Sequence, residues 1–294
     1  MELQESFISY LQYEKRCSSH TIKAYKNDLD QFVEFYTNMV GEFNVNKVDS
    51  KLVREWIVSL MNHEVSARSV NRKITTLKSF YKHLIKLGVI DSNPAKGLAL
   101  PKIRKKLPSF VEEDKLSQLL DNGYFDNDFI GTRDKLIITL FYGTGIRLSE
   151  LIGLKETDID RRNSQIKVLG KRNKERIIPY PVSINQLIEQ YVILKNNVNC
   201  ESAEVLFVTE KGTPVYEKLV YRIVKQNLSK VTLLEKKSPH VLRHTYATHL
   251  LNNGADLNAV KELLGHSNLA ATQIYTHTTF KKLHDIYKQA HPRG

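Results

Sequence analysis

The sequence predicts a mainly α-helical protein with a small antiparallel β element in its second half. Three observations support this class. Apolar residues recur at helical spacing through most of the first hundred residues. Two short β-type runs in the second half, QIKVL and ERIIPY, flank the polar stretch GKRNK. At 294 residues, the chain is long enough for about two domains, each with its own core.

The first half contains three helical patterns in succession, over residues 20–40, 49–63 and 66–88. Ser19 is the expected N-cap of the first helix, and Asp49 or Ser50 that of the second. Gly88 is expected to end the third. One face of the third helix carries an apolar stripe that predicts its buried side: Val70, Ile74, Leu77, Tyr81 and Leu84.

Positive charge is concentrated in one part of a chain whose formal net charge is +12. Residues 1–50 contain 5 Lys/Arg and 8 Asp/Glu, whereas residues 51–106 contain 13 Lys/Arg and 3 Asp/Glu. A solvated basic face is one interpretation, but this concentration favours a polyanionic partner, most simply nucleic acid. The basic residues that lie off the apolar stripe of the third helix are therefore candidates for DNA contact: Arg68, Arg72, Lys78, Lys82 and Lys86.

Residues 92–106 are expected to form an extended basic linker, because prolines punctuate this region and the run PKIRKKLP is rich in bases. It is either a charged surface hinge or a strap around DNA, in which case Arg104, Lys105 and Lys106 contact the phosphates. The sequence thus predicts a helical DNA-binding domain over residues 1–106, linker included, and an α+β domain over residues 107–294.

The second half mixes helices with β structure. Helical patterns occupy residues 112–122, 132–143, 144–154 and 183–197, and helices dominate again after residue 214. QIKVL and ERIIPY predict a β-hairpin with Lys171 at its tip, and VLFVT at 205–209 predicts a further short strand. The tip also carries Arg172 and Lys174, with Arg176 beside them. These basic side chains are either solvated or reach into a DNA groove.

Several protein classes are disfavoured. No apolar run approaches the length of a membrane helix, and the N-terminus lacks the pattern of a signal peptide. The two cysteines, Cys17 and Cys200, are expected to be free thiols in a reducing cytoplasm. His240 and His244 have the spacing of a zinc helix, but Val241 stands where a metalloprotease needs glutamate. The segment GTGIRL lacks the third glycine of a dinucleotide-binding loop.

Three further segments carry residues suited to chemistry on a phosphate. In GTGIRLSELIGL, Arg147 and Glu150 lie on one face at the start of a helix. In SPHVLRHTYATHLLNNG, His240 and Arg243 lie one turn apart near a helix N-terminus, which favours anions. In LLGHSNLAATQIYTH, a glycine ends a helix directly before His266, and a tyrosine follows nine residues later.

Together these residues meet the needs of a metal-free attack on a DNA phosphodiester. Two arginines can neutralise the charge on the non-bridging oxygens without a metal ion. Tyr275 can serve as the nucleophile if a base or a strongly positive site activates its hydroxyl. A lysine on a hairpin can protonate the leaving oxygen.

The ordered set Arg147, Lys171, His240, Arg243, His266 and Tyr275 resembles the tyrosine recombinase (phage integrase) family. The segments GTGIRLSELIGL, GKRNKERIIP, SPHVLRHTYATHLL and LLGHSNLAATQIYTH are very similar to its Xer branch. SSHTIKAYKNDLDQF and NPAKGLALPK also match that branch, so the resemblance covers nearly the whole chain. No catalytic position departs from the family pattern.

The resemblance implies a SAM-like core-binding domain followed by the α+β catalytic domain of the family. It implies that Tyr275 attacks the scissile phosphate and forms a 3′-phosphotyrosyl bond. Arg147 and Arg243 clamp the phosphate, while Lys171 protonates the leaving oxygen. The proton of the tyrosine passes to His240, and His266 hydrogen-bonds the phosphate; Glu150 orients a neighbouring arginine or histidine. No ATP, metal ion or other cofactor is expected.

The resemblance also implies a biological setting. The substrate is a double-stranded DNA core site, bound by four subunits that are copies of this chain or include a sister recombinase. Resolution of chromosome dimers during chromosome segregation and cell division, in the cytoplasm, is the expected role. A DNA translocase remains open as an activating partner, and no membrane is involved. The sequence does not decide between XerC-like and XerD-like identity, and gives neither the DNA target nor the order of strand cleavage.

Other functions remain as alternatives. A phage or transposon integrase has the same chemistry, a type IB topoisomerase shares the tyrosine nucleophile, and a non-catalytic DNA-binding protein would explain the charge alone. Near the C-terminus, Phe280, Leu283, Tyr287 and Ala290 form an apolar stripe. Family resemblance favours docking of this stripe on a neighbouring subunit, and docking on its own domain is the alternative.

Overall fold

The computed structural model describes residues 2–103, 109–170, 175–198, 204–265, 286–287 and 289–293. The chain divides into two units, Met1–Lys106 and Leu107–Gly294. We call them unit 1 and unit 2, and each is described by itself. The described residues are mainly helical, with one small antiparallel sheet in unit 2, as the sequence predicts.

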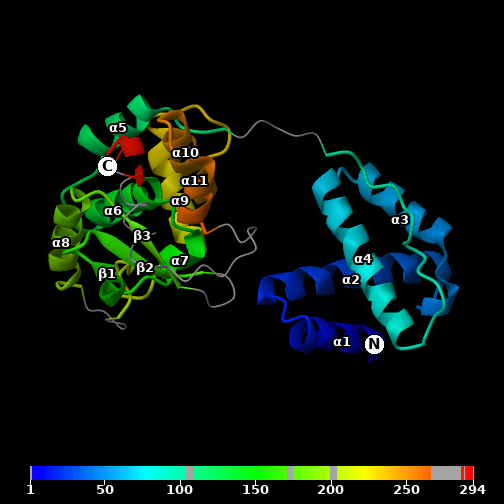
Figure 1. Cartoon of the computed structure of the whole chain (residues 1–294). Helices are drawn as coiled ribbons and strands as arrows, with labels where there is room; N and C mark the ends of the chain where they lie inside the picture. Colours follow the sequence, from blue (N-terminus) through cyan, green and yellow to red (C-terminus); the bar gives the residue numbers. More distant parts are fainter. Residues whose placement is uncertain are drawn as a thin grey trace. The chain divides into compact units, whose positions relative to one another are not determined.

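Unit 1 is helical throughout (Figure 1). Its elements in chain order are α1 (Glu2–Ser9), the π-helix η1 (Tyr10–Glu14), α2 (Ser19–Val40), the 3₁₀-helix η2 (Val45–Lys47), α3 (Ser50–Asn62) and α4 (Ala67–Lys86). The N-cap of α2 is Ser18, whose hydroxyl accepts from the amide of Thr21, so the expectation of Ser19 was wrong by one residue. Asp49 caps α3 in the same way, with the amide of Leu52 as donor.

The core of unit 1 is built around α4. All five residues of the apolar stripe on this helix are fully buried, which confirms the sequence prediction. Aromatic side chains from other elements complete the core; for example, Phe32 of α2 packs edge-on against Trp56 of α3, with ring centroids 5.0 Å apart. After α4, Gly88 adopts a φ of +70°, the left-handed conformation that ends the helix.

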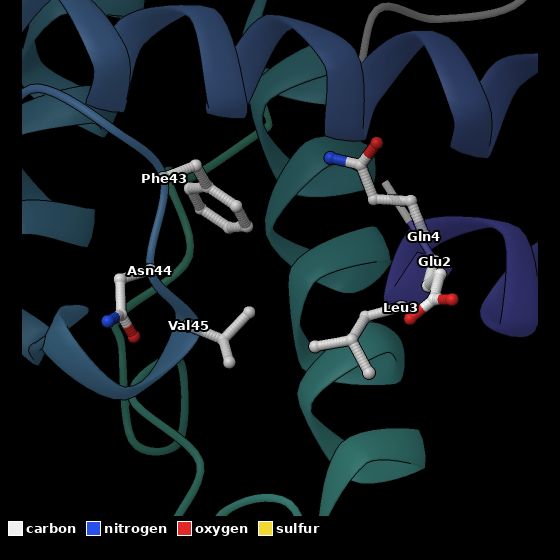
Figure 2. A pocket seen from close by; sticks show the side chains of 6 residues that line it. All are labelled: Glu2, Leu3, Gln4, Phe43, Asn44 and Val45. Atoms are coloured by element: carbon white, nitrogen blue, oxygen red, sulfur yellow. The ribbon is translucent and has the colours of Figure 1, made fainter.

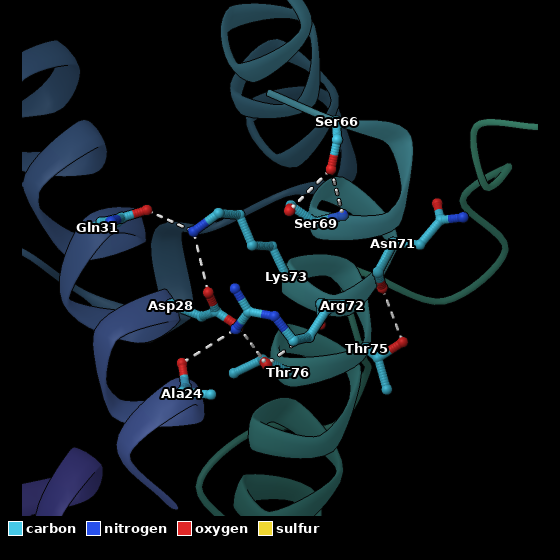
Figure 3. Close-up of polar contacts among 10 residues, drawn as sticks. All are labelled: Ala24, Asp28, Gln31, Ser66, Ser69, Asn71, Arg72, Lys73, Thr75 and Thr76. Atoms are coloured by element: carbon cyan, nitrogen blue, oxygen red, sulfur yellow. Dashed lines mark hydrogen bonds and ion pairs between the residues drawn. The ribbon is translucent and has the colours of Figure 1, made fainter. Parts of the chain in front are cut away.

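A buried polar network joins α2 to α4 (Figure 3). Asp28 is fully buried and accepts hydrogen bonds from Arg72, from Lys73 Nζ at 2.9 Å and from Thr76 Oγ1 at 3.0 Å. The Lys73 ammonium also donates to the side chain of Gln31. Because a buried carboxylate needs compensating partners, this network fixes α2 against α4.

Unit 1 also has a pocket between the start of α1 and the segment leading into η2 (Figure 2). Its lining residues are Glu2, Leu3, Gln4, Phe43, Asn44 and Val45. None of them is a candidate for catalysis or DNA contact, so this pocket lies apart from the predicted site.

Unit 2 contains seven α-helices and a three-stranded sheet among its described residues. The helices are α5 (Glu113–Asp121), α6 (Phe129–Thr144), α7 (Leu148–Ile152), α8 (Ile184–Lys195), α9 (Glu217–Ser229), α10 (Pro239–Asn252) and α11 (Leu257–Leu263); a 3₁₀-helix, η3 (Glu156–Asp158), precedes the sheet. The strands are β1 (Ile159–Asp160), β2 (Gln165–Leu169) and β3 (Glu175–Pro179), in the order β1-β2-β3.

The predicted hairpin strands pair as expected. β2 and β3 are antiparallel, with Gln165 opposite Pro179 and Leu169 opposite Glu175. The expectation of a strand at 205–209 was wrong, because Val205 and Val208 make only isolated bridges. The run VLFVT is apolar because Leu206, Phe207 and Val208 fill the core, and burial alone does not distinguish a strand from an irregular core segment.

Helix α6 is the centre of unit 2. Its residues from Leu136 to Thr144 are buried apart from Thr139, and α8 and α10 pack against it. A helix that is apolar on nearly all sides must be surrounded by other elements. Its C-terminus, which leads directly to Arg147, is therefore held rigidly inside the unit.

Part of the C-terminal segment packs on its own unit. Tyr287 and Ala290 are buried beside Tyr246, and the Tyr287 hydroxyl donates to the carbonyl of Gly143 at 3.0 Å. His291 Nε2 lies 3.1 Å from the carbonyl oxygen of Tyr142. The single chain thus shows the docking on its own domain that the sequence left as the alternative. The other stripe residues, Phe280 and Leu283, lie outside the described residues.

No helix in the described part of the chain is both long enough and apolar enough to span a membrane.

Candidate active site

The site begins at the corner between α6 and α7. Gly145 ends α6 in the left-handed conformation, with a φ of +59°. A Cβ at this position would lie 2.5 Å from Cδ1 of Tyr246, so only glycine fits between the corner and that buried ring. Two residues later, Arg147 caps α7 with its side chain 31% exposed. The tight turn therefore brings this guanidinium from a buried helix end to the surface of the site.

Helix α10 contributes the second arginine. Pro239 is its first residue, as expected, and Arg243 lies on its second turn. The Arg243 guanidinium donates to the carbonyl oxygen of Gly145 and, at 2.6 Å, to that of Leu264. His240 is exposed on the first turn of the same helix, one turn before Arg243.

The two arginines converge on the end of α11. Arg147 Nη2 donates to the carbonyl oxygen of Gly265 at 2.7 Å, and Arg243 Nη2 donates to that of Leu264. Gly265 has a φ of +64° directly after α11, which confirms that it ends this helix. Side chains from two separate helices thus meet at the peptide groups that immediately precede His266.

Glu150 holds Arg147 in place from the first turn of α7. Its Oε1 accepts from Arg147 Nη1 at 2.7 Å, and its Oε2 accepts from the backbone amide of Arg147 at 2.8 Å. The expected role of Glu150 was to orient a neighbouring arginine, and these contacts support it. The same carboxylate binds Arg176 of β3 by a two-pronged contact, at 2.6 Å to Oε1 and 2.9 Å to Oε2.

The pKa values of two charged residues in the site, Glu150 and Arg243, are strongly shifted. Burial alone would raise the pKa of Glu150, but hydrogen bonds and the charge of Arg176, followed by the contacts of Arg147, outweigh it and lower the pKa to about 2. Burial, and then the charges of Arg147 and Arg176, lower the pKa of Arg243 to about 10. At neutral pH, Arg243 therefore remains charged and Glu150 is fully ionised.

The described part of the site carries an excess of positive charge. Three guanidinium groups surround one carboxylate, which leaves a balance that suits an anion. Described partners use two of the five N–H donors of Arg147 and two of those of Arg243. The remaining donors can bind the non-bridging oxygens of a phosphate. Among the described residues, no group of three or more His, Cys, Asp or Glu side chains is arranged to hold a metal ion.

The structure does not describe every predicted site residue. Lys171, His266 and Tyr275 lie outside the described residues, as do the proposed DNA contacts Arg104, Lys105, Lys106, Arg172 and Lys174. The structure brings together Arg147, Arg243 and Glu150, with His240 one turn away.

The DNA-binding candidates of α4 differ from one another. Arg68 and Lys82 are exposed, and Lys78 is partly buried. Arg72 is paired with the buried Asp28, and Lys86 donates to Glu14 at 2.9 Å. Both charges are therefore partly neutralised within unit 1, which weakens the case for Arg72 and Lys86 as phosphate contacts.

Arg176 is the site residue that sequence reasoning missed. The sequence placed it beside a basic hairpin tip, where charge is usually solvated. Its side chain is in fact only 6% exposed. The available signal was the alternation along β3, which puts residue 176 on the same face as the buried Ile178.

Comparisons with known proteins identify the family of this chain. The model of the phage integrase family matches residues 109–282, and that of the phage integrase N-terminal SAM-like domain matches residues 5–88. Tyrosine recombinase XerC of Chlorobaculum tepidum is 37% identical, over 98% of this chain and 94% of its own. XerC of Staphylococcus saprophyticus is 39% identical, over 100% of this chain and 98% of its own.

Solved structures show the same fold. XerH recombinase bound to a palindromic difH substrate has a TM-score of 0.73 at 22% identity, over 96% of this chain and 83% of its own. The Tn1549 transposon integrase in complex with circular intermediate DNA has a TM-score of 0.71 at 21% identity, over 95% and 98% of the two chains. From the family models and the XerC relatives together, the chain belongs to the phage integrase family, in the Xer branch of its tyrosine recombinases, and is an enzyme that breaks and rejoins DNA strands.

Proposed function

We propose that this recombinase cuts DNA by attack of the Tyr275 hydroxyl on the scissile phosphate. The bond between phosphorus and the 5′ oxygen breaks, which leaves a 3′-phosphotyrosyl link and a free 5′-hydroxyl. Lys171 gives a proton to the departing oxygen, and His240 takes the proton of the tyrosine. Rejoining reverses these steps, so the energy of the broken bond is kept and no ATP is consumed.

Arg147 and Arg243 bind the non-bridging oxygens, and His266 adds a hydrogen bond to the same phosphate. The observation that carries this proposal is the convergence of the two guanidinium groups on the carbonyls of Leu264 and Gly265. Because these carbonyls end α11, the chain continues directly from the arginines to His266. The surplus positive charge of the clamp stabilises the phosphate as its charge develops during attack.

Unit 1 is proposed to hold the double-stranded DNA core site through Arg68, Lys78 and Lys82, with further contacts from the linker. Four subunits act together on two sites, and they are copies of this chain or include a sister recombinase. The role is the resolution of chromosome dimers in the cytoplasm, with a DNA translocase as a candidate activator. An integrase of a phage or transposon, with the same chemistry, is the second candidate, because the Tn1549 integrase shares the fold.

Covalent trapping tests the chemistry. Denaturing the protein while it is bound to genomic DNA should leave adducts, and sequencing the attached DNA should identify the target. Tyr275→Phe is expected to abolish the adduct and to spare DNA binding, because only the nucleophilic oxygen is lost. Adduct at the wild-type level from this variant would place the nucleophile elsewhere.

Two further measurements separate the alternatives. Cleavage should persist in a chelator, and a strict requirement for magnesium or zinc would contradict the metal-free clamp. A plasmid with two copies of the trapped sequence should be converted into two circles. Relaxation of a plasmid that lacks this sequence would instead indicate a topoisomerase, and binding without any adduct would indicate a non-catalytic protein.

A further inference from the structure

We propose that Arg176 is a positioning residue for the phosphate clamp: acting through Glu150, it fixes Arg147 and ties the base of the basic hairpin to the peptide that precedes His266. This inference rests on the proposed function, because it assigns to Arg176 a part in the reaction of that same site. The side chain itself is buried, so it acts on the phosphate through its neighbours.

The geometry of Glu150 supports this role. Each of its carboxylate oxygens accepts one hydrogen bond from Arg147 and one from Arg176, all between 2.6 and 2.9 Å. With both of its oxygens occupied in this way, the carboxylate has no freedom to rotate. The fork of Arg176 therefore fixes Glu150, and Glu150 in turn fixes the guanidinium that faces the phosphate.

A second contact joins Arg176 to the end of α11. A Cβ built on Gly265 would lie 3.1 Å from Cδ and Nε of Arg176, so this guanidinium stem lies directly against the Gly265 peptide. The carbonyl of the same residue accepts from Arg147 Nη2 at 2.7 Å. Gly265 therefore contacts two arginines, Arg147 at the start of α7 and Arg176 on β3.

The position of Arg176 in the chain gives this contact its consequence. Arg176 is the second residue of β3, and it stands five positions after Lys171 in the chain. A single side chain thus connects the strand below the proposed general acid with Arg147 and with the segment that leads to His266. By chain position, Arg176 thus lies close to Lys171, and it contacts the residue that precedes His266.

Stability alone is a weak reason for such an arginine. A buried ion pair is often no better than a well-packed apolar pair, because both charges lose their hydration. In addition, Nε of Arg176 is buried and has no hydrogen-bond partner among the described residues. A buried donor without an acceptor is unfavourable. A fold that needed only packing at this position would be served better by methionine.

The test uses the full-length chain and a nicked duplex that carries the sequence recovered by covalent trapping. Arg176→Met removes the guanidinium group but keeps a side chain of similar length, and Arg176→Lys keeps the positive charge without the two-pronged contact to Glu150. Lys167→Met on β2 is the matched control, because it removes one positive charge from an exposed pair with Glu175. The rate of adduct formation is measured at saturating protein, and DNA affinity is measured separately.

We expect Arg176→Met to slow adduct formation on the order of 10- to 100-fold, by analogy with the loss typical when the hydrogen-bond partner of a metal-ligating side chain is removed. DNA affinity should stay within about twofold of wild type, because the clamp phosphate is one contact among many. The rate of adduct formation by Arg176→Lys should lie between those of wild type and Arg176→Met, and the rate of Lys167→Met should match wild type. In an Arg147→Ala background, Arg176→Met should slow adduct formation by a smaller factor than it does in the wild type, because one of the groups that it positions is gone.

A substrate with a methylphosphonate at the scissile position separates positioning from folding. This group lacks the negative charge that the arginines neutralise, so the loss caused by Arg176→Met should shrink at least about tenfold on it. A variant that is only partly folded would lose the same fraction on both substrates, and that result would overturn the proposal. Normal rates for Arg176→Met would overturn it as well. A wild-type chain that forms no adduct would contradict the proposed function and this inference with it.

Discussion

Replacing Glu150 by glutamine is expected to destabilise unit 2 in a pH-dependent way. The substitution keeps the shape of the side chain and removes its charge, so the guanidinium groups of Arg147 and Arg176 lose their only described counter-charge. Breaking a buried pair by removing one partner leaves an uncompensated charge and is strongly unfavourable. The free energy of unfolding should therefore fall.

The pKa of Glu150 sets the magnitude and the pH range. In the folded chain this pKa is about 2, against an ordinary value of 4.5. At 1.36 kcal/mol for each pKa unit, the charged form contributes on the order of 3 kcal/mol. Because the folded pKa is the lower one, this contribution is complete above pH 4.5 and is lost as the pH falls toward 2. The difference between wild type and Glu150→Gln should follow the same course.

Urea unfolding followed by circular dichroism measures the effect. Trp56 is the only tryptophan and lies in the core of unit 1, so its fluorescence reports on that unit and should be unchanged. Glu189→Gln, an exposed position on α8, is the matched control for loss of one negative charge. The double variant Glu150→Gln with Arg176→Met should regain part of the lost stability, because it no longer buries an unpaired guanidinium.

Two results would refute this reasoning. If Glu150→Gln unfolds within about 0.5 kcal/mol of wild type at pH 7, the carboxylate does not hold the arginines together as the structure implies. If the difference is large but the same at pH 7 and pH 3, it arises from packing and not from charge.

Three other outcomes are expected. Lys82→Ala should reduce the slope of log affinity for DNA against log salt by about 0.9, whereas Lys86→Ala should change it less because Glu14 already pairs with that lysine; equal changes would contradict this distinction. Gly145→Ala should lower the free energy of unfolding by about 2 kcal/mol or more, because its Cβ would clash with the ring of the buried Tyr246. Gly88→Ala has a similar backbone strain but open space around the new Cβ, so it should cost about 1 kcal/mol in the same urea unfolding experiment. A stop codon after Thr279 should lower the free energy of unfolding, because it removes Tyr287 and Ala290 from the core around Tyr246, and an unchanged free energy would contradict the docking of this segment on its own unit.

Much of unit 1 follows from local sequence rules. A helical apolar stripe and a capping side chain are short-range features, so the bounds of α3 and α4 were predicted within about two residues. The cap of α2 was missed because Ser18 and Ser19 stand side by side and have the same chemistry. The pairing of Arg72 with Asp28 was not predictable, because the two residues are 44 positions apart and only the packing of α2 on α4 brings them together.

In unit 2, the sequence predicted that Arg147 and Arg243 belong to one site but not how their side chains are held. Arg147, His240 and Arg243 were identified from motifs, and Glu150 was expected to orient a neighbour. That the guanidinium groups grip the carbonyls at the end of α11 depends on three elements meeting in space. Such backbone acceptors leave no mark on the identity of the side chains at 264 and 265, except that Gly265 must tolerate a positive φ.

Arg176 shows where charge patterns mislead. In GKRNKER, four basic residues stand within seven positions, and composition alone treats them as one solvated group. Strand alternation separates them, because Glu175 and Ile177 are exposed while Arg176 and Ile178 are buried. An arginine on the apolar face of a strand must have a buried acceptor, and in this chain the capping carboxylate of α7 supplies it. Of the four basic residues in this run, Arg176 is thus the one whose side chain faces inward and binds a residue of the site.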